Sequence, residues 1–149
     1  MVVDVRTEIT IGRPRGEVYD FAANPTHAPE WYVNIKSVEW VTPPPLVLGS
    51  KVAFVAHFLG RRLAYTYEVT ELVPVERLVM RTTEGPFPME TTYTWEPSGA
   101  GSTRMTLRNR GEPTGFTKLA GPIMAAAMRR ANRKDLARLK NLLEQPAGS

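Results

Sequence analysis

Most of the chain up to residue 110 consists of short segments in which polar and apolar residues alternate, separated by turn signals. From Val3 to Ile11, every second side chain is apolar or a threonine, which is typical of a strand with one buried face. Six further strands are predicted at residues 38–40, 51–58, 63–72, 77–83, 89–96 and 103–110. Because short turns join successive strands, the sequence predicts one antiparallel sheet of seven strands.

Helices are predicted on either side of this run of strands. Pro14 suits the first turn of a helix, and Asn24-Pro25 ends that helix, since a residue before proline avoids the helical region. A second short helix is predicted at residues 28–32. A long helix is predicted at residues 116–144, with Pro122 as a kink or a new start. The apolar face of the sheet needs a cover, so we expect an α+β fold with the sheet wrapped around the long helix.

Small residues in the first half of the long helix indicate a pocket beneath it. Alanines at 125–127 and 131 leave space, and Met124 and Met128 adapt to irregular shapes. The alternative is that alanine is present there as the best helix former. Strand alternation then predicts the walls. The strand at residues 51–58 allows either face to point inward; we favour Phe54, Ala56 and Phe58 inward, which places His57 outward. The predicted ligand-binding residues from the strands and the helix are Phe54, Phe58, Tyr65, Tyr67, Met80, Met89, Tyr93, Trp95, Met105, Asn109, Met124, Ala127, Met128 and Ala131.

No catalytic motif is visible in the sequence. The chain has no cysteine, and neither of its two histidines has metal-ligand spacing, so we predict no metal and no cofactor. Acid–base chemistry by the inward tyrosines or Asn109 is the remaining possibility. Glu90 or Arg108 would join them only if the strand alternation were shifted by one residue. The catalytic residues are therefore left unassigned.

The net charge of +4 owes much to arginines and lysines near the C-terminus. A solvated helix face is favoured over a nucleic-acid or membrane patch, because Leu136, Leu139 and Leu143 supply an apolar stripe for packing. The chain opens without a signal-peptide pattern and has no membrane-spanning run, so we expect a cytoplasmic protein. We expect one domain at residues 1–146, a short disordered tail at 147–149, and a monomer or homodimer.

Four stretches, in order along the chain, carry the motifs of a known superfamily. They are IGRPRGEVYDFAANPTHAPEWYVNI at residues 11–35, VTELVPVERLVMR at 69–81, YTWEPSGAGSTRMTL at 93–107 and DLARLKNLLE at 135–144. They contain a proline-started helix followed by P-E-W, a V-x-E-x-x-P-x-x-R-L turn, an E-P-x-G-x-G-x-T-R hairpin and a helix end. The chain resembles the START/Bet v1-like (SRPBCC) superfamily, particularly its polyketide cyclase/dehydrase-like branch.

This resemblance implies a helix-grip fold with a deep hydrophobic pocket, and it places Trp31 near the pocket entrance. We expect the protein to bind a lipid, a polyketide or an aromatic molecule between the sheet and the C-terminal helix. One alternative is a polyketide cyclase/dehydrase-like enzyme that uses polar groups in the same cavity. Another is an interaction module that uses the basic face of the C-terminal helix.

Overall fold

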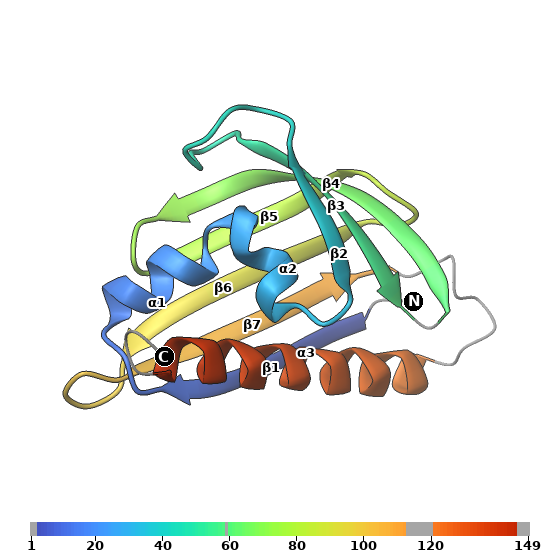
Figure 1. The fold of residues 1–149 in the computed structure, drawn as a ribbon. Coiled ribbons are helices and arrows are strands. Elements are labelled where there is room, and N and C mark those ends of the chain that lie inside the picture. The colour runs from blue at the N-terminus through green and yellow to red at the C-terminus, as the bar shows by residue number, and fades with distance from the viewer. Residues whose placement is uncertain (1–2, 59, 113–120, 146–149) are drawn as a thin grey trace.

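A single curled sheet packs against one long helix in the computed structural model, which describes residues 3–58, 60–112 and 121–145 (Figure 1). The sheet has seven antiparallel strands in the order β1-β7-β6-β5-β4-β3-β2. This confirms the predicted sheet and its alternation. The strands are β1 (Val3–Ile11), β2 (Ile35–Trp40), β3 (Lys51–Phe58), β4 (Arg61–Val73), β5 (Arg77–Glu84), β6 (Met89–Pro97) and β7 (Thr103–Gly111).

Two short helices follow β1, as predicted: α1 (Arg15–Ala22) and α2 (Ala28–Trp31). Pro14 lies just before α1 as its N-cap, not inside its first turn. A 3-10 turn, η1 (Pro25–His27), lies between the two helices and was not predicted from the sequence. Asn24 is its N-cap, and the Asn24 side chain accepts a hydrogen bond from the Thr26 N–H at 3.0 Å.

The long helix α3 (Gly121–Glu144) lies along β1 and faces the concave side of the sheet (Figure 1). Pro122 is in the first turn of its described part, where a missing N–H costs little. The predicted helical residues 116–120 and the predicted tail at 147–149 lie outside the described residues. The end of α3 is fixed to the β1–α1 connection, because the Gly12 N–H donates to Glu144 Oε2 at 2.7 Å.

Irregular pairing bends the sheet around the helix. The register of β4 with β5 shifts at Thr66/Tyr67 and again at Val69/Glu71, and β2 with β3 shifts at Ile35/Ser37. An extra residue on one strand sharpens the local twist and bend. The edge formed by β2 and β3 therefore curls over toward α2 (Figure 1).

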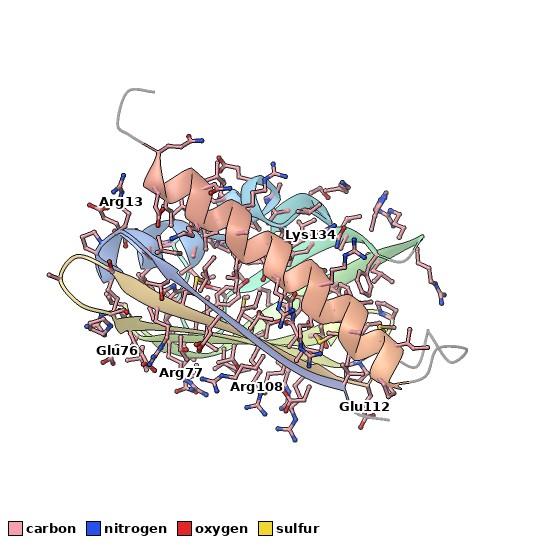
Figure 2. The ribbon with its side chains drawn as sticks, turned by 90° about the horizontal axis from the view of Figure 1, so that it is seen from below. Arg13, Glu76, Arg77, Arg108, Glu112 and Lys134 are labelled. Atoms are coloured by element: carbon pink, nitrogen blue, oxygen red, sulfur yellow. The ribbon has the colours of Figure 1, made fainter. Side chains whose placement is uncertain are left out.

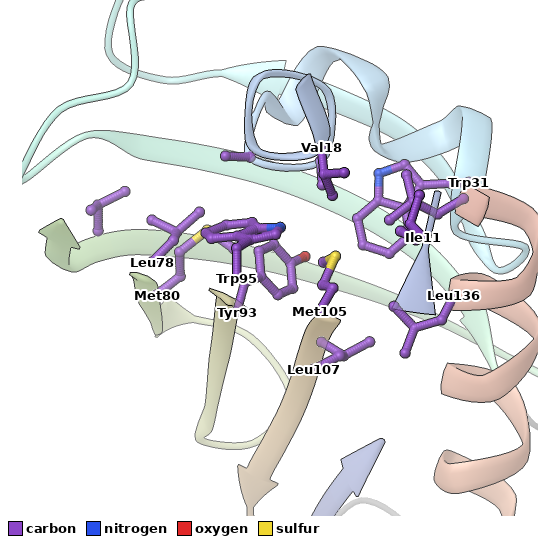
Figure 3. Close-up of a cluster of buried hydrophobic side chains, with 14 residues drawn as sticks. Ile11, Val18, Trp31, Leu78, Met80, Tyr93, Trp95, Met105, Leu107 and Leu136 are labelled. Carbon is purple, nitrogen blue, oxygen red and sulfur yellow. The ribbon is translucent and has the colours of Figure 1, made fainter. Parts of the chain in front are cut away.

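The two faces of the sheet differ as the alternation requires. Figure 2 shows Arg77 and Arg108 pointing away from α3, and Arg108 Nη2 lies 2.6 Å from Asp4 Oδ2 on this outer face. Figure 3 shows the inner face, where Trp95 and Met105 lie opposite Val18 of α1. The main core therefore fills the end of the fold that α1 covers.

Leu139 tests the role of α3 in this core. The side chain is 0% exposed, so Leu139→Ala is expected to lower the free energy of unfolding by about 2–5 kcal/mol through lost burial and a residual cavity. Ile123 on the same helix is 58% exposed, so Ile123→Ala should change stability by less than about 0.5 kcal/mol. Urea denaturation measures both. Equal losses would mean that α3 does not pack as described.

Candidate functional site

The described residues line a partly open cavity of about 160 Å³ between the sheet, α2 and α3. An apolar cavity of about 150 Å³ admits a benzene-sized molecule, so this one has room for a compound of roughly one ring. Its wall includes most of the residues proposed from the sequence: Trp31, Phe54, Phe58, Tyr65, Tyr67, Met80, Met89, Tyr93, Asn109, Met124, Met128 and Ala131. Trp31 is 0% exposed and so belongs to the inner wall instead of a solvent-facing entrance.

Three proposed residues do not line the cavity, and their places in the fold explain why. Trp95 and Met105 are inward, but they lie at the end of β6 and β7 that α1 covers; the Trp95 ring packs edge-on against Tyr19 at 5.1 Å between centroids. Ala127 lies off the stripe of α3 that faces the cavity and is partly exposed. The alternation correctly predicted that Trp95 and Met105 point inward. It could not predict where along each strand the solid core ends and the cavity begins.

A close backbone approach helps to hold Tyr65 in the wall. Gly85 has φ +155°, and a Cβ built there would lie 2.6 Å from Cδ1 of the Tyr65 ring. A larger residue would displace either the β5–β6 connection or the ring.

A strand alternation shifted by one residue would bring charged side chains into the cavity, and the structure excludes it. Arg81 Nε lies 3.8 Å from Glu90 Oε2 on the outer side of the sheet.

A directional chain of hydrogen bonds runs through the polar part of the wall. The Thr91 hydroxyl donates to Asn109 Oδ1 at 2.8 Å, and Asn109 Nδ2 donates to Asn132 Oδ1 at 3.2 Å. The chain ends at Asn132 Nδ2, which is buried and has no acceptor among the described residues. A buried donor without a partner costs about 1–3 kcal/mol, so this amide is a destabilising feature of the cavity wall.

Buried tyrosines supply further polar atoms. The Tyr32 and Tyr93 hydroxyls are hydrogen-bonded to each other across the wall. Burial raises the pKa of Tyr67 to about 12, and burial also raises the pKa values of Tyr32 and Tyr93. These phenols therefore stay neutral at physiological pH, where each can donate and accept a hydrogen bond.

Asp135 is the one carboxylate among the described lining residues. Its side chain is 2% exposed, and Oδ1 accepts a hydrogen bond from the Val33 N–H at 2.9 Å, which ties α3 to the residue after Tyr32. Burial raises the pKa of the Asp135 carboxyl to about 7, against the opposing effects of the Val33 hydrogen bond and the positive charge of Arg138. The group can therefore gain or lose a proton near neutral pH.

The sequence analysis did not assign Tyr32, Asn132 or Asp135 to the site. Helical spacing could have indicated the last two, because Asn132 follows Met128 by four residues and Asp135 follows it by seven, on the same stripe of α3. Tyr32 closes α2 and could be placed only once the fold was known. No lysine, arginine or histidine is among the lining residues in the described ranges, and no three potential ligands there are grouped to hold a metal ion.

The raised pKa of Asp135 predicts how stability depends on pH. The folded protein binds a proton between about pH 4 and pH 7 that the unfolded chain has already lost, so stability falls as pH rises through that range. Between pH 5 and pH 8, the free energy of unfolding should fall by about 2–3 kcal/mol more in the wild type than in Asp135→Asn. Urea denaturation at both pH values measures this, and parallel changes in the two proteins would contradict it.

Comparisons with known proteins agree with the fold and show the family of this chain. The model of the family described as polyketide cyclase/dehydrase and lipid transport matches residues 2–144, whereas no curated protein sequence matches. None of the helices in the described part of the chain is long and apolar enough to cross a bilayer.

Solved structures share the helix-grip, Bet v1-like fold across almost the whole chain. The protein TTHA0849 of Thermus thermophilus is 23% identical with a TM-score of 0.80, over 94% of this chain and 96% of that one. A START superfamily protein of Mycobacterium smegmatis is 15% identical with a TM-score of 0.81, over 95% of this chain and 97% of that one. The ZhuI aromatase/cyclase of a Streptomyces species is 17% identical with a TM-score of 0.80, over 100% of this chain and 99% of that one. The chain belongs to the polyketide cyclase/dehydrase and lipid transport family of the SRPBCC superfamily.

Proposed function

We propose that this protein binds an apolar small molecule of about one ring in the cavity between the sheet and α3. The observation that carries the proposal is a cavity with largely apolar walls and a few polar groups that are hydrogen-bonded to one another. That combination is typical of small-molecule sites, in which apolar surface supplies affinity and polar atoms fix orientation.

The family and the size of the cavity support this proposal from two directions. The family description names lipid transport beside polyketide cyclase and dehydrase activities, and lipids and polyketides are largely apolar molecules. The volume of about 160 Å³ suits a compact aromatic or aliphatic compound. A long lipid or an extended polyketide would extend beyond this volume.

Ala131 provides the direct test of binding. It lines the cavity, so Ala131→Phe places a ring in the space that the ligand would occupy. Titration of ethylbenzene, followed by NMR chemical shifts, should show binding to the wild type and at least about tenfold weaker binding to Ala131→Phe, since filling the site removes the apolar contact.

Ala126→Phe is the matched control, because Ala126 lies on the exposed side of the same helix. This variant should bind ethylbenzene as the wild type does. Absence of binding to the wild type, or equal binding by wild type and Ala131→Phe, would contradict the proposal. Native mass spectrometry of the freshly purified protein would show whether a compound is carried from the cell.

Asp135 favours a second candidate function, catalysis by proton transfer. A carboxyl with a pKa of about 7 inside an apolar cavity can act as a base near neutral pH. Bound beside a ketone, the carboxylate would take a proton from the carbon next to the carbonyl, and the resulting enolate would regain a proton from the carboxylic acid. The Tyr32–Tyr93 pair could donate a hydrogen bond to the developing negative oxygen.

Deuterium exchange tests this second function. The methyl protons of acetophenone, followed by NMR in deuterated water, should exchange at least about tenfold faster with the wild type than with Asp135→Asn. Acetophenone should bind equally to the two proteins, because asparagine keeps the shape and the acceptor for Val33. Equal exchange rates would restrict the protein to binding.

A further inference from the structure

We propose, on the basis of the binding function above, that the cavity selects neutral ligands that present a hydrogen-bond acceptor, such as a ketone or an ester carbonyl, and rejects carboxylates. The inference rests on two independent features of the wall: a buried donor without an acceptor, and the absence of positive charge among the described lining residues.

The donor is at the end of the hydrogen-bond chain that crosses the wall. Thr91 donates to Asn109 and Asn109 donates to Asn132, so the carbonyl oxygen of each amide is already occupied. The Asn132 Nδ2 hydrogens have no partner in the described structure, although the residue is only 5% exposed. Trp31 Nε1, on another lining residue, is a second buried donor without a partner there. A ligand oxygen that accepts from Nδ2 would complete the chain.

Charge on the wall excludes an anionic head group. The ionisable groups among the described lining residues are all acids: the carboxyl of Asp135 and the phenols of Tyr32, Tyr65, Tyr67 and Tyr93. A buried carboxylate ligand would lose its hydration without meeting a cation and would be repelled by an ionised Asp135. A free fatty acid or an aromatic acid is therefore disfavoured.

A cationic ligand is disfavoured by different contacts. An ammonium group has no lone pair with which to accept from Asn132 Nδ2. Asp135 is the one possible counter-charge in the described wall, and burial raises its pKa to about 7, so near that pH the carboxyl is only partly ionised. The hydration that an ammonium group loses is therefore only partly replaced. The neutral carbonyl compound is the class that meets the free donor and carries no uncompensated charge into the cavity.

Three compounds of nearly the same shape test the selection at pH 7: ethylbenzene, acetophenone and benzoate. NMR titration of the wild type should give a dissociation constant for acetophenone at least about fivefold lower than that for ethylbenzene, which corresponds to one net hydrogen bond. Benzoate should bind at least about tenfold more weakly than acetophenone, because its charge loses hydration without gaining a cation.

Two variants assign the preference to the donor. The double variant Asn109→Leu/Asn132→Leu removes the terminal donor without freeing the amide of Asn109, which donates to Asn132, so acetophenone should lose its advantage over ethylbenzene. Asn141→Leu changes an exposed amide of the same helix and should leave the advantage unchanged. A preference that survives in the double variant, or that Asn141→Leu abolishes, overturns the inference.

The outcomes separate this inference from the binding function on which it rests. If none of the three compounds binds the wild type, the proposed function itself fails. If ethylbenzene binds but acetophenone binds no more tightly, only the selectivity fails. Tighter binding of benzoate or of 1-phenylethylamine than of acetophenone also overturns the selectivity and indicates a charged ligand.

Discussion

A bent sheet with one apolar face has to be covered, and here a single long helix faces its concave side. α3 lies along β1, while α1 covers the far end of β6 and β7 with Val18 and Tyr19. Side chains fill the space at that end. At the other end of the helix, Met124 and Met128 pack against Val3 and Val5 in a second buried cluster, and the cavity is lined by residues of both clusters.

The two ends of α3 therefore have different roles. Leu136 and Leu139 belong to the solid core, and the Gly12–Glu144 hydrogen bond fixes the same end. Residues 124, 128, 131 and 132 face the cavity. Asp135 stands at the junction, beside Val33. Met124 and Met128 both line the cavity and pack against Val3 and Val5, so changes at these two positions should affect stability as well as the cavity wall.

Much of the fold could be predicted because it depends on local patterns. Period-two alternation located the strands and their inward faces, including the outward His57, and proline located the helix boundaries. The places where the cavity ends could not be predicted in this way. Trp95 and Met105 point to the same face of the sheet as Tyr93 and Asn109. The first two lie under α1 and belong to the core, whereas the last two line the cavity, and only the position of α1 distinguishes them.

The polar part of the site was hidden for a related reason. Asn132 and Asp135 lie in a segment dominated by exposed arginines and lysines, so each looks like another residue of a solvated face. Their burial becomes visible only when α3 is placed against β7 and α2, where Asn109 and Val33 meet them. Burying an unpaired amide and a carboxyl works against stability. The proposed binding of a polar atom therefore depends on these two residues more than on the aromatic lining.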